Sequence, residues 1–297
     1  MIALLVTICA YTVDRPMPRP HPIIWFTLLF FTQVSWASST IPNPPAAFDN
    51  QHDLLLFNFD LKTDVDDLHT VAALDLILNN EKYRPHHYIA LHGTYGLQAG
   101  LFVPAKALFR HTFGSHWVDI HGNRDKAFAT VLTAMHKTLS NQGRIWIAEA
   151  GQSDISAALI SSYRTRYGAL GKSQIVIVQH SQWNEDETSQ EALALVKQHA
   201  TYIKIPDGNA ADNGTPGFND PTFAVNKLEQ PGQLSRQTWQ LANQLSRQYN
   251  GKNERYLNQT IANGGADFSD LAEVIWILQI AEVDTVAAFF AQFSGAE

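Results

Sequence analysis

The hydrophobic residues of this chain gather in short, nearly continuous runs, and a segment with apolar residues at helical spacing follows each run. Runs of this length are typical of strands buried on both faces of a parallel sheet, and the intervening segments are typical of covering helices. The strands are expected at 54–59, 88–92, 144–149, 174–179 and 201–205, and the helices at 68–78, 98–109, 155–166 and 189–199. The pattern predicts an α/β fold, a single domain with a mostly parallel open sheet flanked by helices in a Rossmann-like arrangement.

The chain changes character after residue 205. Residues 206–221 are rich in glycine, asparagine and proline, and a loop of this length is either a lid or binding loop or else mobile surface. Residues 268–291 have a strong helical period and predict a helix near the end of the chain.

Polar side chains follow four of the expected strands. They lie at 60–67, 92–94, 149–154 and 180–185. Ligands of open parallel sheets bind beyond the carboxyl ends of the strands, so these four clusters are expected to meet at one rim.

The first cluster is the most informative, because four carboxylates fall within eight positions. Asp60, Asp64, Asp66 and Asp67 follow an apolar run, and only Lys62 interrupts their charge. Crowded carboxylates repel one another and disfavour ionisation. Calcium and magnesium bind oxygen ligands and would neutralise the group. The cluster therefore indicates a site for a hard divalent cation.

Structural roles also explain part of this cluster. Acids in the first turn of a helix interact favourably with its dipole and cap free N–H groups, which would account for Asp64 and Asp66. Asp60 and Asp67 differ, because a strand end and a helix start can direct their oxygens at one point. A calcium-binding helix-loop-helix motif is excluded, since its glycine and distal glutamate are missing. The D-x-D of haloacid dehalogenase phosphatases is not matched, because Lys62 stands at the second acid.

Residues 1–37 have the order of a secretory signal peptide. Arg15 and Arg19 precede the apolar stretch 23–31, and Ser35-Trp36-Ala37 supplies small residues at a cleavage site. An N-terminal membrane anchor is the alternative, but the apolar stretch falls short of the roughly 20 residues that a spanning helix needs. We therefore expect a periplasmic or secreted protein.

The expected organisation is a signal peptide at 1–37, a lead-in at 38–50 and the α/β domain at 51–297, with Met17 as an alternative start. The whole chain has 21 lysines and arginines against 28 acids. Without residues 1–37 the balance is 19 against 27, a net charge of −8. This balance argues against nucleic acid and anionic membranes as partners. The single cysteine, Cys9, lies within the signal, so disulfides and thiol chemistry are not expected.

The residues Asn58 to Asp67, N-F-D-L-K-T-D-V-D-D, resemble the N-terminal signature of the nucleoside hydrolase superfamily in its longer bacterial form. The resemblance implies the nucleoside hydrolase type of fold. It also implies that Asp60 is a calcium ligand and the general base, that Asp67 is a bidentate calcium ligand, and that Asp66 contacts the sugar hydroxyls.

Three later stretches resemble turns of that family and occur in its order. His92-Gly93-Thr94-Tyr95-Gly96 is similar to its T-x-x-G-N turn. The A-G-Q-S-D-I of 150–155 is similar to G-P-L-T-N-I, which implies that the Ser153 main-chain carbonyl binds calcium. The S-D-L-A of 269–272 is similar to H-D-P-x-A and makes Asp270 the third acidic ligand.

The resemblance implies an exported, calcium-dependent glycoside hydrolase that cleaves an N-glycosidic bond of a ribonucleoside or a related sugar conjugate. Water oriented by the metal would attack, with Asp60 as base. His180 is the candidate acid for the leaving group, and His92 and Trp183 are further donors or stacking partners. Asn184 and Glu185 fall where the family binds the sugar. Simpler roles also exist. His92 and His180 could be hydrogen-bonded loop histidines, and Trp183 could cover the sheet edge. Asp267 could be a helix cap.

Four residues depart from the family pattern. Asn58 replaces an Asp, Lys62 a Gly, Leu97 an Asn and Ser269 a His. Lys62 would partly replace the charge of a cation, and the loss of recognition groups favours the alternative of a non-catalytic sugar-binding protein on the same fold. The expected partner is a small sugar or nucleoside whose identity the sequence does not give. Family members are often dimers or tetramers, so a homo-oligomer is expected by analogy alone.

Overall fold

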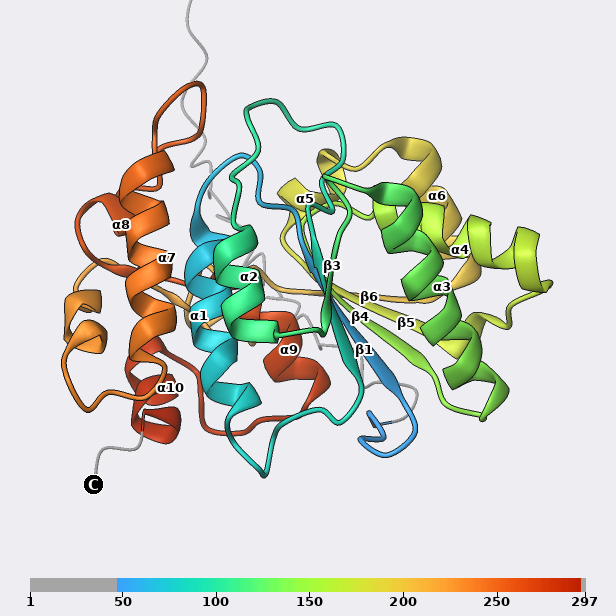
Figure 1. The fold of residues 1–297 in the computed structure, drawn as a ribbon, viewed down its shortest axis with the longest axis horizontal. Coiled ribbons are helices and arrows are strands. Elements are labelled where there is room, and N and C mark those ends of the chain that lie inside the picture. The colour runs from blue at the N-terminus through green and yellow to red at the C-terminus, as the bar shows by residue number, and fades with distance from the viewer. Residues whose placement is uncertain (1–46, 295–297) are drawn as a thin grey trace, which may run out of the picture. The chain divides into compact units, whose positions relative to one another are not determined.

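A six-stranded sheet, parallel throughout, forms the centre of the computed structural model, which describes residues 47–294 (Figure 1). The strands are β1 (Leu54–Phe59), β2 (Tyr88–His92), β3 (Trp117–Asp119), β4 (Ile145–Ala150), β5 (Ile175–His180) and β6 (Thr201–Ile205). Their order is β3-β2-β1-β4-β5-β6, with β1 and β4 in the middle. The predicted single-domain α/β fold with a parallel open sheet is confirmed.

The register brings the carboxyl ends of the central strands to one rim. Phe59, the last residue of β1, pairs with His92 of β2 and with Ala150 of β4. His180, the last residue of β5, pairs with Ile205 of β6. The residues after these strands therefore emerge at the same edge of the sheet, as the sequence predicts.

Helices cover both faces of the sheet. One layer contains α3 (Arg124–Ser140), α4 (Asp154–Tyr167) and α6 (Gln190–His199), and the other contains α1 (Asp66–Leu78), α2 (Lys106–Phe113) and α9 (Ala272–Ile277), with α7 (Arg236–Tyr249) packed outside α1 (Figure 1). The shorter elements are α5 (Gln182–Asp186), α8 (Gln259–Ala262), α10 (Val286–Phe293), η1 (Lys172–Gln174), η2 (Val225–Glu229), η3 (Ser269–Leu271) and the antiparallel pair β7 (Asn219–Asp220) and β8 (Ala266–Asp267).

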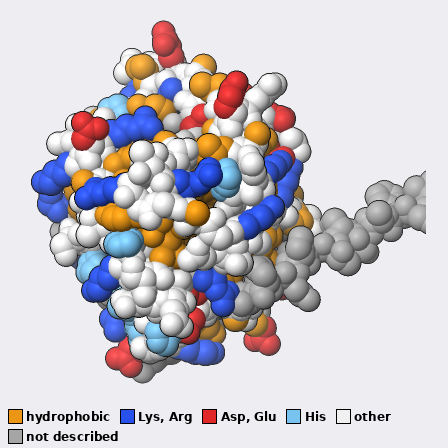
Figure 2. Space-filling view, turned by 90° about the vertical axis from the view of Figure 1, so that its right-hand side faces the viewer, with side chains coloured by type: hydrophobic (Ala, Val, Ile, Leu, Met, Phe, Trp, Pro, Cys, Tyr) orange, Lys and Arg blue, Asp and Glu red, His pale blue; other side chains and the backbone are white. Residues whose placement is uncertain are grey.

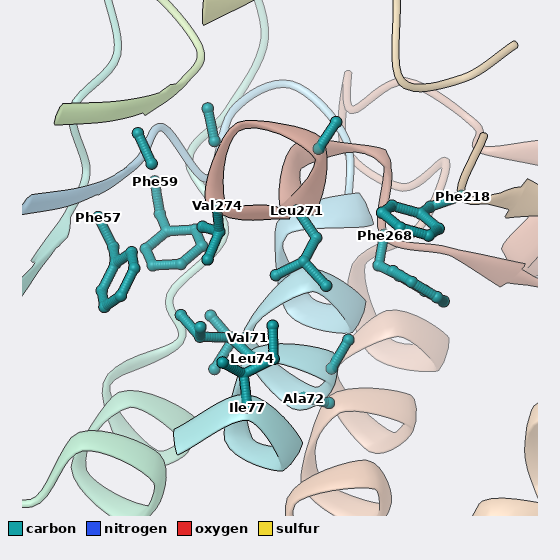
Figure 3. Packing of buried hydrophobic residues seen from close by; sticks show 14 of the residues in the cluster. Phe57, Phe59, Val71, Ala72, Leu74, Ile77, Phe218, Phe268, Leu271 and Val274 are labelled. Carbon is teal, nitrogen blue, oxygen red and sulfur yellow. The ribbon is translucent and has the colours of Figure 1, made fainter. Parts of the chain in front are cut away.

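Alternate side chains of the strands pack into two separate cores. Phe57 and Phe59 join Leu74 of α1 in one core, whereas Leu54 and Leu56 join the α3 and α4 layer. Figure 3 shows the first core, in which Phe59 of β1, Leu74 of α1 and Val274 of α9 lie close together. Helix α1 is apolar on nearly all sides because it is enclosed between the sheet and α7. Its first turn is thereby held rigidly at the rim.

Two helix predictions are wrong in their extent. The helix expected at 98–109 begins only at Lys106, because Gln98 is used to bind the β1–α1 loop and Gly100 has φ +90°. The helix expected at 268–291 is split into η3, α9 and α10. Gln279 and Glu282 between α9 and α10 have φ of +52° and +64°, which a continuous helix does not allow.

The hydrophobic pattern also fails to predict β3, α3 and α7. No helix among residues 47–294 combines the length and the apolar content needed to cross a bilayer. The predicted signal peptide, the lead-in up to residue 46 and Cys9 lie outside the described residues. Figure 2 shows the face over α3, α4 and α6, where lysine and arginine side chains outnumber the acids.

Candidate active site

A cavity of about 520 Å³ opens at the carboxyl ends of the parallel strands. The β1–α1 loop, the turn after β4, the residues after β5 and the 206–221 loop contribute to its wall, together with residues 256–270. Six aspartates line it, namely Asp60, Asp64, Asp66, Asp207, Asp267 and Asp270. Lys62 is the one lysine or arginine among the described lining residues. The predicted rim is therefore a strongly acidic cavity, and the 206–221 loop is part of it.

Asp60 follows β1 directly, and both of its carboxylate oxygens accept hydrogen bonds. The Lys62 backbone N–H donates to Oδ1 at 2.8 Å, and the Gln98 amide donates to Oδ2 at 3.0 Å. Gln98 is fully buried and also contacts the buried Gln152. A carboxylate whose direction is fixed on both sides is well placed to accept a proton from a bound water.

Asp67 lies in the first turn of α1, beside Asp66. Its Oδ2 accepts the backbone N–H of Leu61 at 2.5 Å, and Leu61 has φ +52°, an unusual conformation for a leucine. Its Oδ1 is buried and has no hydrogen-bond partner among the described residues. An unpaired buried carboxylate oxygen is costly, and Asp67 lies behind the cavity, since it is not among the lining residues.

The acids influence one another strongly. Burial raises the pKa values of Asp60, Asp66 and Asp67 well above the usual range, and the neighbouring carboxylate of Asp270 raises them further. A positive charge at this point would oppose these shifts, because it stabilises the ionised forms.

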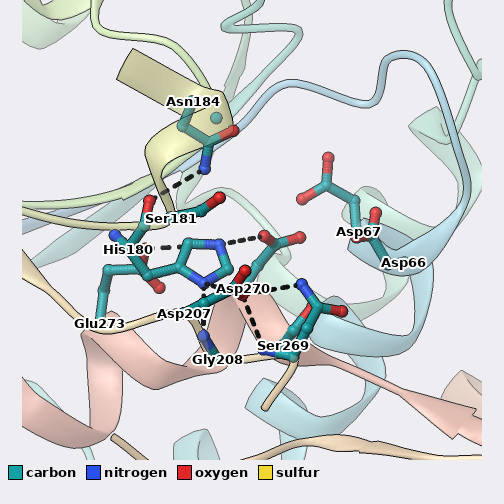
Figure 4. Close-up of polar contacts among 12 residues, drawn as sticks. Asp66, Asp67, His180, Ser181, Asn184, Asp207, Gly208, Ser269, Asp270 and Glu273 are labelled. Atoms are coloured by element: carbon teal, nitrogen blue, oxygen red, sulfur yellow. Dashed lines mark hydrogen bonds and ion pairs between the residues drawn. The ribbon is translucent and has the colours of Figure 1, made fainter. Parts of the chain in front are cut away.

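Asp270 comes from η3, near the end of the chain, and is held by His180. The two atoms Nε2 of His180 and Oδ1 of Asp270 are 3.1 Å apart, and the Gly208 backbone N–H donates to Nδ1 at 3.0 Å. Figure 4 shows this pair across the site from Asp66 and Asp67. Burial lowers the pKa of His180, but the carboxylates of Glu273 and Asp270 outweigh burial and raise it to about 9.

The Gly208 contact requires a neutral ring, in which Nδ1 accepts, whereas the two carboxylates favour the imidazolium. In both states the Nε2 proton is directed at Asp270. Glu273 fixes the backbone of His180, since its Oε1 accepts the His180 N–H at 2.9 Å. His180 lines the cavity as predicted, but its contacts give it the role of orienting Asp270.

Asp267 is a buried acid of the cavity wall and receives hydrogen bonds from three side chains. Asn219 and Asn258 donate to Oδ2 at 3.0 and 2.7 Å, and the Ser269 hydroxyl donates to Oδ1 at 3.0 Å. Burial raises its pKa to about 7, although the Asn258 hydrogen bond opposes this. The carboxylate therefore joins β7, α8 and η3, which goes beyond the expected role of a helix cap.

Some predicted site residues reach the cavity and others do not. Trp183 and Asn184 line it, and Trp183 is 47% exposed. Glu185 instead forms ion pairs with Lys197 and Lys204 at 2.7 and 3.1 Å. Glu185 is not among the residues that line the cavity.

His92 is buried in an aromatic cluster with Phe102 and Phe109, and it is not among the lining residues. Its Nδ1 pairs with Asp119 at 3.0 Å, and the burial of the ring lowers its pKa to about 4. The structure therefore gives His92 the simpler role of a hydrogen-bonded core histidine. The Ser153 carbonyl accepts the Ala157 N–H at 2.8 Å as the first bond of α4, and Ala150 and Gly151 line the cavity at this turn.

Residues 47–294 contain no group of three or more histidine, cysteine, aspartate or glutamate side chains arranged to hold a metal ion. Asp270 lies close enough to raise the pKa values of Asp60 and Asp67. Two observations fit a cation at this place. Asp67 Oδ1 has no hydrogen-bond partner among the described residues, and the neighbouring carboxylates repel one another.

Sequence reasoning missed the residues that orient the acids, which are Gln98, Gln152, Glu273, Asn219 and Asn258. Their amide and carboxyl groups occur in no distinctive spacing, so no sequence signal identified them. The structure shows the surroundings of the four residues that depart from the family pattern. Asn58 points below the cavity, Lys62 lines it, Leu97 is 70% exposed, and Ser269 binds Asp267.

Asn58 belongs to a buried polar group under the site. Its amide donates to Glu149 Oε1 at 2.6 Å and to the Ser156 hydroxyl at 3.0 Å, and Ser156 contacts Glu149 Oε2. Burial raises the pKa of Glu149 to about 7, although both hydrogen bonds oppose the shift. The folded protein therefore prefers the protonated form of Glu149.

We expect Glu149→Gln to stabilise the protein at pH 8 and to have little effect near pH 4.5. Glu149 ionises near pH 4.5 in the unfolded chain but only near pH 7 in the folded chain. The contribution of Glu149 to wild-type stability is therefore fully present below pH 4.5 and is lost as the pH rises to 7. The gain should reach about 3 kcal/mol of unfolding free energy. Urea unfolding at pH 5 and pH 8 measures it, with Glu191→Gln on the surface as control. An equal difference at both pH values would contradict the assignment.

A scan against protein-family models finds no match for this chain, and a search of curated proteins finds none either.

Proposed function

We propose that this chain is a hydrolase of N-glycosidic bonds that acts on a ribonucleoside or a related sugar conjugate. One observation carries the proposal: Asp60, Asp66 and Asp270 line the same cavity although they come from distant parts of the chain. Their order along the chain is that of the nucleoside hydrolase motifs. The resemblance of those motifs supplies the reaction, and the cavity volume of about 520 Å³ suits a small-molecule substrate.

The proposed cofactor is one calcium ion. Asp60, Asp67 and Asp270 would hold it, and the resemblance adds the main chain at Ser153. The ion would supply a Lewis acid that lowers the pKa of a water molecule. The unpaired, buried Asp67 Oδ1 supports this assignment, because such an oxygen needs a positive partner.

The chain's own residues then have defined tasks. Asp60, fixed by Lys62 N–H and Gln98, accepts the proton of the attacking water. Asp66 opens into the cavity and is assigned to the sugar hydroxyls. His180 holds Asp270 in place through Nε2, and so acts as a positioning residue.

A sugar-binding protein without catalysis is the second candidate. One observation favours it. The family's histidine before Asp270 is replaced by Ser269, and the Ser269 hydroxyl is turned to Asp267. Calcium-dependent binding of a sugar without turnover of any glycoside would establish this alternative.

Calcium should stabilise the folded protein. At a free concentration 100-fold above its Kd, a ligand adds about 2.7 kcal/mol to the unfolding free energy, which corresponds to a Tm rise of about 5–10 °C for a domain of this size. Asp67→Asn should remove most of the rise, since the Leu61 hydrogen bond is kept while the charge is lost. Calorimetric titration and thermal unfolding measure both effects.

The exposed Asp125 in the first turn of α3 is the control for that experiment, and Asp125→Asn should leave the calcium response unchanged. No heat of binding together with no change in Tm would end the metal proposal. Export to the periplasm or medium, and a homo-oligomer, remain proposals from the sequence.

A further inference from the structure

We propose that the cavity selects glycosides whose leaving group already carries a positive charge, such as N-ribosylpyridinium compounds or N7-alkylated purine ribosides. The inference rests on the proposed function and names its substrate class. Three independent features of the cavity carry it.

The first feature is uncompensated negative charge. Six carboxylates line the cavity, and Lys62 and His180 are the basic side chains among the described lining residues. The Lys62 ammonium is 4.8 Å from the centre of the Tyr95 ring, so it already has a partner at the rim. A divalent cation, Lys62 and the His180 imidazolium together would offset four of the six charges. The remainder attracts a cationic ligand and repels an anionic one.

The second feature is that the histidine of the cavity wall is not free to protonate a neutral leaving group. His180 is the one histidine among the described lining residues, and both of its ring nitrogens are engaged, Nε2 with Asp270 and Nδ1 with the Gly208 N–H. The Asn184 amide donates to the His180 carbonyl at 3.3 Å. A neutral purine or pyrimidine needs protonation to leave, whereas a cationic ring does not.

The third feature is a pair of exposed aromatic side chains on the wall. Trp183 of α5 is 47% exposed and Tyr256 is 63% exposed. Both have anchored backbones, since the Trp183 N–H donates to the Ser181 hydroxyl and the Tyr256 N–H donates to the Thr63 carbonyl at 3.0 Å. Aromatic faces attract cations, and a flat cationic ring can stack on them as well.

The reaction balances without another reactant. Water oxygen bonds to the anomeric carbon while one of its protons passes to Asp60. The bond between the anomeric carbon and the ring nitrogen breaks, and its electron pair stays on that nitrogen. The ring leaves as a neutral heterocycle, and the sugar keeps a hydroxyl group at the anomeric carbon.

Two matched pairs of compounds test the inference on the full-length, calcium-supplemented protein. Calorimetry compares 1-methylnicotinamide, a cation, with neutral nicotinamide, and the cation should bind on the order of tenfold more tightly. Initial rates of hydrolysis are measured for 7-methylguanosine and for guanosine. The rate acceleration, which is the enzymatic rate divided by the uncatalysed rate, is compared between the two compounds. The cationic riboside should have the larger acceleration, again by about tenfold.

Variants locate the effect in the cavity. Asp64→Asn keeps an oxygen for the Asp66 N–H and removes one charge, and it should reduce the binding preference about threefold or more. Trp183→Ala should reduce the preference similarly, whereas Trp183→Phe should keep most of it. Asp186→Asn, on α5 but outside the lining, should leave the preference unchanged.

Equal binding of 1-methylnicotinamide and nicotinamide would overturn the inference. If both nucleosides are hydrolysed with equal acceleration, the inference fails and the proposed function stands. If the cation is bound selectively but neither nucleoside is hydrolysed, the proposed function fails while the cation selectivity of the cavity is supported.

Discussion

Asp60→Asn should reduce kcat/KM for any glycoside that the protein cleaves by ~10²–10⁴-fold, the usual contribution of a positioned general base. The asparagine has the same size and can still accept the Lys62 N–H, so the fold is preserved. Because burial and Asp270 raise the pKa of Asp60, removing its charge should leave stability at pH 8 unchanged or raised. Steady-state kinetics and urea unfolding of the same sample measure the two effects.

Asp125→Asn on the surface of α3 provides the matched control, with unchanged rate and stability. Full activity in Asp60→Asn would show that another group accepts the proton. Loss of activity together with loss of stability would point to a structural role for Asp60.

Gly151→Ala should reduce activity about 100-fold, although the change adds only one methyl group. Gly151 has φ +133°, and a Cβ atom there would come within 2.6 Å of Asp60 Oδ2 and 2.7 Å of Asp60 Cβ. Asp60 must therefore move, and a displacement on the order of 1 Å at a reacting group costs about 10²-fold in rate. The strain should also lower the unfolding free energy by about 1–3 kcal/mol.

Gly168→Ala separates backbone strain from the displacement of Asp60. Gly168 has φ +99°, but a Cβ atom there would meet no atom within 4 Å. This variant should lose stability to a similar degree and keep its kcat/KM. If the two variants lose the same fraction of activity, contact with Asp60 is not the cause.

The sheet could be predicted because burial on both faces leaves a direct trace in the sequence. β1 and β4 are buried along their whole length, so every position is apolar or small except Asn58 and Glu149, which bind each other. The edge strand β3 has three half-buried residues and leaves no such trace. The interruption after α9 was missed for a similar reason, because its apolar residues keep a helical period while Gln279 takes a positive φ.

The acidic site could be predicted in part. Asp60, Asp66 and Asp67 fall within eight positions of the sequence. The end of a parallel strand has a known position in the fold, so their place near the rim needed no coordinates. His92 has the same position at the end of β2, yet its ring packs against Phe102 and Phe109 behind the rim. A strand end fixes where a residue is, and the neighbours that pack on it decide where its side chain points.

The sequence by itself determined the parallel α/β sheet, the rim at which the site forms and the concentration of acids there, because these follow from local patterns of burial and charge. The tertiary structure decided how those acids are held. Gln98 and Gln152 reach Asp60, His180 reaches Asp270 across 90 residues, and Asn219 and Asn258 reach Asp267. These are contacts between distant segments made by common polar side chains, so they exist only once the chain has packed.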